Sequence, residues 1–161
     1  MNPAIDATNP ITEFLVAHII GVYFVYGLAF FTLGIVMALA SRQNSTLPLM
    51  RALPLLAWFG LLHGANEWAE MFQRIAAQNS GYTPGVTGEA LRIALLVASF
   101  LCLLGFGIAA LRPGSVSPAQ RRLLFFLPLG VWAATLVAAL LYWRPSPWEG
   151  VAFADVLSRY F

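Results

Sequence analysis

Three ionisable side chains share one face of a single apolar segment of the chain. His63, Glu67 and Glu70 follow the spacing i, i+4 and i+7, which places them on the same side of a helix over residues 53–72. A charged side chain deep in a membrane helix costs roughly 2.5–3.5 kcal/mol, and such side chains face the interior of a helix bundle. Imidazole and carboxylate groups bind transition metals and exchange protons. We therefore take these three residues as the centre of a candidate functional site.

A second histidine, His18, lies in the preceding apolar segment. In an antiparallel hairpin of the two segments, we expect His18 near the depth of Glu67 and Glu70. The same register places His63 about six residues deeper, near residues 23–26. The predicted ligand-binding set is therefore His18, His63, Glu67 and Glu70.

Three interpretations of these side chains remain open. In the first, His18, His63 and Glu67 bind a transition metal, for which copper, zinc or iron is suited to imidazole and carboxylate ligands. In the second, His18 and His63 are axial ligands of haem b, although the expected register offsets them by roughly 9 Å. In the third, the polar side chains hold helices together or line a cavity for a small ligand or a proton.

The composition restricts the class of protein that positions these residues. Of 161 residues, 60% are hydrophobic and 10% are charged, and the nine basic residues are all arginine. Soluble domains contain about 25% charged residues, so this chain is expected in the lipid bilayer. The net charge of +2 is small and scattered, so no nucleic-acid partner is expected. Cys102 is the one cysteine, which excludes an internal disulfide and a cysteine-based zinc site.

Four apolar segments are each long enough to cross a hydrocarbon core of about 30 Å. We expect an all-α integral membrane protein with one domain over residues 1–161. Its four-helix bundle has predicted spans at 11–40, 53–72, 90–111 and 123–143. Ser146 and Glu149 form a predicted capping box that opens a short interfacial helix over residues 147–161. Gly60 and Gly64 form a GxxxG pattern, which favours close approach of another helix.

The arginines predict the orientation in the membrane. The two loops that follow the first and third spans contain five arginines and no acid, namely Arg42, Arg51, Arg112, Arg121 and Arg122. Short loops rich in arginine stay in the cytoplasm. We therefore expect a multi-pass protein of the bacterial inner membrane with both termini on the periplasmic side.

The chain contains a His63-Gly64-x-x-Glu67-Trp68 motif and four related stretches, namely residues 23–34, 51–56, 59–68 and 155–160. These stretches resemble the N-terminal multi-span membrane region of bacterial sensory proteins, chiefly histidine kinases and diguanylate cyclases. The resemblance implies a membrane-embedded sensory module whose signal enters through the helix bundle. It also implies a further span leading to a cytoplasmic effector, and this chain departs from that pattern by ending at Phe161.

The sequence thus predicts a sensory or ligand-binding module that detects a small ligand, a metal or a proton through its His/Glu cluster. No serine or cysteine nucleophile has an evident base beside it, so an enzyme is not expected. A homo-oligomer or a larger membrane complex is the expected assembly. The alternative function is an accessory subunit of a respiratory or photosynthetic membrane complex, or a b-type haem protein.

Overall fold

The computed structural model describes residues 14, 17–42, 48–83, 85–111, 116–143 and 146–160. Within these residues the chain is helical and contains no strand, which confirms the expected all-α class for this part of the chain. The elements are α2 (Ile19–Ala40), the 3-10 helix η1 (Pro48–Arg51), α3 (Leu53–Ser80), α4 (Val86–Ala110), α5 (Pro118–Trp143) and α6 (Pro147–Tyr160).

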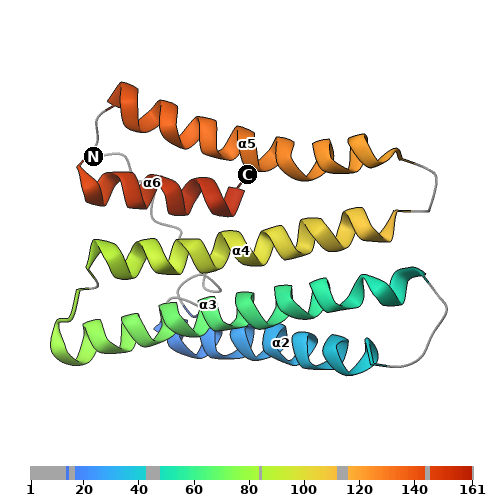
Figure 1. The fold of residues 1–161 in the computed structure, drawn as a ribbon. Helices are drawn as coiled ribbons and strands as arrows, with labels where there is room; N and C mark the ends of the chain where they lie inside the picture. The colour runs from blue at the N-terminus through green and yellow to red at the C-terminus, as the bar shows by residue number, and fades with distance from the viewer. Residues whose placement is uncertain are drawn as a thin grey trace, which may run out of the picture.

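The four long helices lie side by side, and the short helix α6 runs beside α4 and α5 (Figure 1). Helix α3 packs mainly on α2 along one side and on α4 along the other. Helix α5 makes far fewer contacts, which it divides between α4 and α6. The core of the molecule therefore lies around α3, the helix that carries His63, Glu67 and Glu70.

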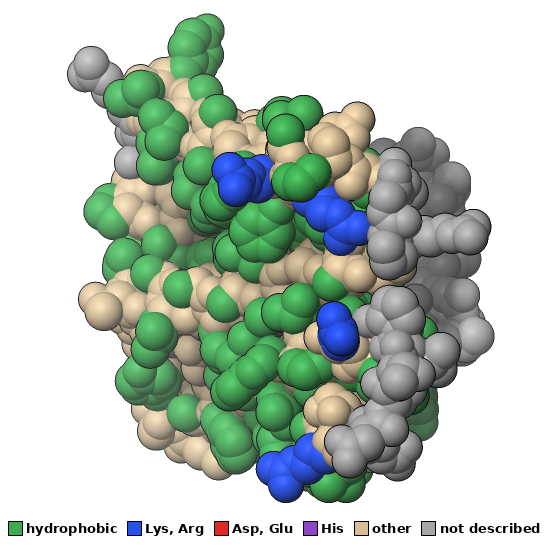
Figure 2. Space-filling model, turned by 45° about the vertical axis from the view of Figure 1, so that its right-hand side comes forward, with side chains coloured by type: hydrophobic (Ala, Val, Ile, Leu, Met, Phe, Trp, Pro, Cys, Tyr) green, Lys and Arg blue, Asp and Glu red, His purple; other side chains and the backbone are tan. Residues whose placement is uncertain are grey.

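Three of the described helices are long and apolar enough to cross a membrane: Ile19–Ala40, Val86–Ala110 and Pro118–Tyr142. They correspond to the predicted spans at 11–40, 90–111 and 123–143, although α4 and α5 begin about four to five residues earlier than expected. The fourth predicted span, 53–72, lies within α3, which is not among the three. Figure 2 shows one face of the molecule, where hydrophobic side chains predominate and the visible basic side chains gather toward one end.

Glycines let α2 and α3 pack backbone against backbone. A Cβ atom built on Gly60 would lie 2.6 Å from the backbone nitrogen of Gly34 and 2.7 Å from the carbonyl oxygen of Phe30. One built on Gly64 would lie 2.8 Å from the carbonyl oxygen of Gly27. Because neither position has room for a side chain, the predicted close approach at the GxxxG pattern is confirmed.

Helix α6 was expected to lie along the membrane surface, but it runs alongside α4 and α5 and packs against both (Figure 1). Its buried residues Gly150, Ala154 and Ser158 are spaced by four, so they form a stripe of small residues on one face. The predicted capping box is present, since the backbone nitrogen of Ser146 donates to Glu149 Oε2 at 2.7 Å. This hydrogen bond from the Ser146 backbone, together with that from its side chain, lowers the pKa of Glu149.

Candidate functional site

His63 lies in the interior of the helix assembly, where its side chain is surrounded by aromatic rings. The residue is 7% exposed, and its Nδ1 atom lies 3.2 Å from the hydroxyl oxygen of Ser99 on α4. The centroid of the imidazole lies 4.4, 5.3 and 5.4 Å from the ring centroids of Phe30, Phe59 and Phe100. The imidazole is thus held by α2, α3 and α4 together.

Glu67 is buried one helical turn from His63, as the i, i+4 spacing predicts. It is 4% exposed, and its Oε1 atom lies 3.8 Å from His63 Nε2. The same oxygen accepts a hydrogen bond of 3.3 Å from the Asn66 amide. Asn66 is fully buried, and its Oδ1 atom has no hydrogen-bond partner among the described residues. The site therefore combines a buried acid and base with an acceptor that is still free to bind a donor or a cation.

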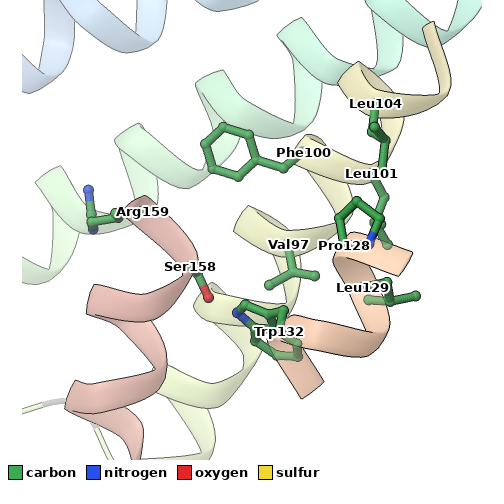
Figure 3. Close-up of a pocket in the computed structure, with 9 residues that line it drawn as sticks. All are labelled: Val97, Phe100, Leu101, Leu104, Pro128, Leu129, Trp132, Ser158 and Arg159. Carbon is green, nitrogen blue, oxygen red and sulfur yellow. The ribbon is translucent and has the colours of Figure 1, made fainter. Parts of the chain in front are cut away.

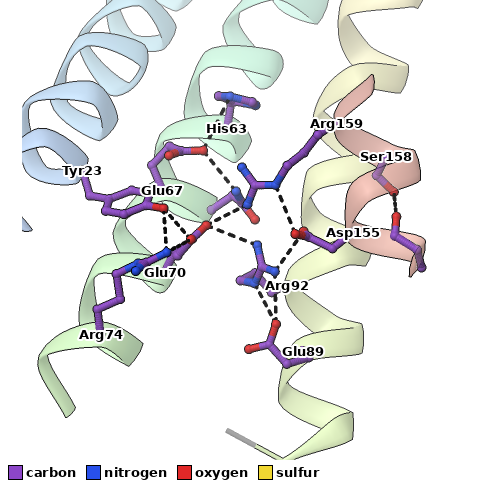
Figure 4. Close-up of polar contacts among 12 residues, drawn as sticks. Tyr23, His63, Glu67, Glu70, Arg74, Glu89, Arg92, Asp155, Ser158 and Arg159 are labelled. Atoms are coloured by element: carbon purple, nitrogen blue, oxygen red, sulfur yellow. Dashed lines mark hydrogen bonds and ion pairs between the residues drawn. The ribbon is translucent and has the colours of Figure 1, made fainter. Parts of the chain in front are cut away.

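Glu70 lies a further turn along α3 and contacts four side chains, one from the next turn of α3 and three from other helices (Figure 4). Its carboxylate accepts hydrogen bonds from Arg74 at 2.9 Å and from Arg159 at 2.7 Å. It also lies 3.4 Å from Arg92 Nη1 and accepts a hydrogen bond from the hydroxyl group of Tyr23. One carboxylate therefore connects α2, α3, α4 and α6.

The partners of Glu70 are themselves bound to two further acids. Arg92 contacts Asp155 at 2.9 Å and Glu89 at 3.1 Å, and Arg159 contacts Asp155 at 3.2 Å. We call these six charged residues the Glu70 network; it contains three arginines and three acids, namely Arg74, Arg92, Arg159, Glu70, Glu89 and Asp155. Its formal charges therefore balance, which is the condition under which buried charges are tolerated.

The acidic partners of Arg159 stabilise its charged form and so support the attachment of α6 to this network. Burial on its own lowers the pKa of Arg159, but Asp155 and Glu70 outweigh it and raise the pKa above its ordinary value. The guanidinium therefore stays charged, and α6 remains tied to α3 at any pH at which Glu70 and Asp155 are ionised.

His18 is not part of this site. Its side chain is exposed, its Nδ1 atom lies 2.9 Å from the carbonyl oxygen of Phe14, and its ring stacks on that of Phe14. His63 packs against Phe30, which is twelve residues further along α2 and hence about 18 Å from His18. The register also differs from the expected one, because Phe30 and not residues 23–26 lies opposite His63.

This placement bears directly on the metal and haem interpretations. Of the three predicted metal ligands, the structure brings His63 and Glu67 together and leaves His18 apart. Within the described part of the chain, no group of three His, Cys, Asp or Glu side chains could hold a metal ion. His18 and His63 are too far apart for both to ligate one haem iron, so this arrangement does not fit haem b.

We compared the chain with protein-family models, curated proteins and solved structures. None of them matches it. The function is therefore argued from the geometry of the site.

The sequence did not predict several residues of the site, among them Ser99, Arg92, Asp155 and Arg159. Asp155 and Arg159 are spaced i, i+4, which indicates an ion pair along one helix but not its partners on α3 and α4. Arg92 stands within the predicted span at 90–111, where a lone arginine is itself a signal of a buried partner. Ser99 carries no such signal, because a serine in an apolar helix commonly bonds its own preceding turn.

Proposed function

We propose that this protein is a non-enzymatic, membrane-embedded sensory module in which His63 and Glu67 receive the signal and the Glu70 network passes it to α6. The observation that supports this proposal is a polar path inside an otherwise apolar chain. It runs along α3 from the His63–Glu67 pair to Glu70 and from there to Arg159 on α6. Helix packing by itself does not require such a row of polar side chains, because small residues are sufficient for membrane helices to pack closely.

The chemistry of the pair defines what it can detect. A neutral His63 beside an ionised Glu67 carries one negative charge, which a proton or a metal cation would cancel. Such a change occurs one helical turn from Glu70, within a site where the low dielectric strengthens electrostatic coupling. The charged and titratable groups on other helices gather around Glu70, one turn from the pair. Tyr23 on α2, Arg92 on α4 and Arg159 on α6 contact Glu70 itself, and the two arginines in turn contact Glu89 or Asp155. A small polar ligand that bonds Asn66 Oδ1 would act at the same place.

We further propose that α3 is the fourth membrane span. Over residues 53–72 its polar face is covered by α2 and α4, so that this part of the helix can lie in the bilayer with His63, Glu67 and Glu70 largely shielded from lipid. The end of the bundle where α2 finishes and α3 and α5 begin carries Arg42, Arg51, Arg121 and Arg122. We assign this end to the cytoplasm of a bacterial inner membrane, following the distribution of arginines.

Two substitutions test the sensory role. With His63→Leu or Glu67→Gln, we expect α6 to lose its response to pH between about 8 and 5, or to added Zn²⁺ or Cu²⁺, because the pair can no longer change charge. The measurement is hydrogen–deuterium exchange of α6 amides in the protein reconstituted in lipid, corrected for the intrinsic exchange rate. The wild-type protein should show a several-fold change in exchange, about 1 kcal/mol in local opening.

The matched control is Glu149→Gln, which removes an exposed acid from α6 itself. It should leave the response of α6 as in the wild type. An unchanged response in both His63→Leu and Glu67→Gln contradicts the proposed function, and membrane insertion of each variant is checked by its yield in the membrane fraction.

An accessory subunit of a larger respiratory or photosynthetic complex is the second candidate, and α5 is the observation in its favour. No described residue of 118–142 is fully buried and α5 makes few contacts with α4 and α6, so most of its surface is open to a partner or to lipid. A subunit purified in a mild detergent should co-migrate with its complex. A sensory module should migrate as a monomer or a homo-oligomer.

A further inference from the structure

A cavity of about 300 Å³ lies between α4, α5 and the last turn of α6 (Figure 3). It is lined by Val97, Phe100, Leu101, Leu104, Pro128, Leu129, Trp132, Ser158 and Arg159. Most of these side chains are apolar, and the polar ones all lie on the side where α6 ends (Figure 3). A largely apolar cavity with a few polar groups at one side is typical of a site for a small lipophilic molecule.

The indole of Trp132 provides an unused hydrogen-bond donor at this cavity. Its Nε1 atom is buried and has no partner among the described residues. In Figure 3 the nitrogen lies on the side of the ring that faces Ser158, whose hydroxyl donates to the carbonyl oxygen of Ala154 at 2.7 Å. Buried donors are almost always paired, so an unpaired indole N–H beside a cavity indicates a missing acceptor.

The depth of Trp132 excludes an ordinary membrane lipid as the source of that acceptor. The residue lies about 21 Å from the start of α5 and about 16 Å from its end, which is near the middle of a span. The ester carbonyls of phospholipids lie at the interface, outside a hydrocarbon core about 30 Å thick. The acceptor therefore belongs to a molecule that resides within the hydrocarbon.

The charges at the cavity indicate that this acceptor is neutral. Arg159 already bonds Asp155 and Glu70, and the Glu70 network balances without any further anion. A carboxylate ligand would add an unpaired negative charge in a low-dielectric region, at a high desolvation cost. A ketone, ester or quinone carbonyl accepts a hydrogen bond without adding charge.

We propose that this cavity binds a lipophilic molecule with a neutral carbonyl, whose oxygen accepts the Trp132 N–H and whose hydrocarbon packs against Val97 and Leu101. Neighbouring side chains cover the N–H. Binding of the carbonyl therefore requires a small rotation of the Trp132 indole or of the Ser158 side chain that exposes the N–H to the cavity. This ligand site extends the proposed sensory function. Its coupling to His63 and to the Glu70 network rests on that proposed function. Phe100 lines the cavity and packs against His63, and Arg159 lines it and bonds Glu70.

Three probes of matched length test the chemistry of the ligand: decan-2-one, undecane and decanoate. They are titrated into the full chain in lipid nanodiscs, and binding is followed by the ¹⁵N–¹H signals of the tryptophan indoles. The Trp132 signal is assigned from its absence in Trp132→Phe. We expect decan-2-one to shift that signal and to bind about tenfold more tightly than undecane, which is the effect of one hydrogen bond.

Trp132→Phe should bind decan-2-one no more tightly than undecane, since the variant keeps the aromatic ring but lacks the N–H. Trp58→Phe, which alters an exposed tryptophan on α3, should bind as the wild type does. If Trp132→Phe does not fold, Val97→Phe fills the cavity and should abolish ketone binding. The proposal is overturned if undecane binds the wild-type protein as tightly as decan-2-one does, or if decanoate binds it more tightly. It is also overturned if Trp132→Phe and Val97→Phe both bind decan-2-one as tightly as the wild type does.

The two proposals fail separately. If decan-2-one does not bind while α6 still responds to pH or metal, the ligand proposal is wrong and the sensory role of His63 stands. If the ketone binds but His63→Leu leaves the response of α6 intact, the cavity is a binding site and the sensory role is wrong.

Discussion

Replacing Glu70 with glutamine is expected to destabilise the protein by about 3 kcal/mol and to loosen α6. The substitution keeps the shape of the side chain but removes the negative charge that Arg74, Arg92 and Arg159 share. Removing one partner of a buried ion pair costs about 3–5 kcal/mol, because the remaining charge stays buried without compensation. We choose the lower end because Arg92 and Arg159 keep their contacts to Asp155, and because the side chains of Arg74 and Arg159 are partly exposed to solvent that screens their charge. The measurement is the free energy of unfolding in mixed micelles by denaturant titration.

The matched control for this substitution is Glu149→Gln, an exposed acid that contacts only the capping serine in the described part of the chain. It should leave the global unfolding transition close to that of the wild type. Hydrogen exchange supplies a second readout, since the α6 amides should exchange faster in Glu70→Gln than in Glu149→Gln. Equal stability of the two variants would show that the Glu70 network does not hold α6 in place.

Introducing a methyl group at Gly60 is expected to be equally damaging, for a steric reason. In Gly60→Ala the new Cβ would lie 2.6–2.8 Å from backbone atoms of Phe30 and Gly34 on α2. Backbone atoms cannot rotate away as a flexible side chain can, so the two helix backbones must move apart at this contact. Overpacking of this kind costs about 1–3 kcal/mol, and we expect the upper end, measured as a loss of unfolding free energy.

Gly107→Ala and Gly130→Ala are the matched controls, because no atom lies within 4 Å of a Cβ built at either position. Alanine is favoured over glycine inside a helix by up to about 1 kcal/mol, so both controls should be neutral or stabilising. The sign of the change in unfolding free energy therefore distinguishes a steric clash between α2 and α3 from the helix propensity of alanine. A Gly60→Ala variant as stable as Gly107→Ala would mean that α2 and α3 do not pack as closely as described.

Spacing along α3 was sufficient to identify the three residues at the centre of the polar site. The i, i+4, i+7 pattern correctly grouped His63, Glu67 and Glu70 on one face, because helix geometry alone decides which residues share a face. The GxxxG pattern correctly indicated close packing for the same reason. The predicted partnership of these residues with His18 was wrong in its geometry, since Phe30 occupies the position opposite His63.

The register of α2 against α3 is the reason for that difference. Periodicity shows which face of a helix is buried, but sliding one helix along another by a turn leaves the faces unchanged. The register depends on where Gly27 and Gly34 meet Gly64 and Gly60, which is a property of the packed pair of helices. The same limit applies to Trp132, because only the packing of the surrounding side chains leaves its N–H without an acceptor.

The sequence by itself determined the all-helical class and identified the ionisable residues whose burial in an apolar segment is energetically unfavourable. An 18-residue apolar stretch and a charge within it are properties of the chain, independent of its neighbours. Only the tertiary structure decided which charges meet. Arg92 and Arg159 reach Glu70 from residues 22 and 89 positions away, and their docking turns a presumed surface helix into part of the bundle. Long-range ion pairs of this kind arise from packing and leave no periodic pattern in the sequence.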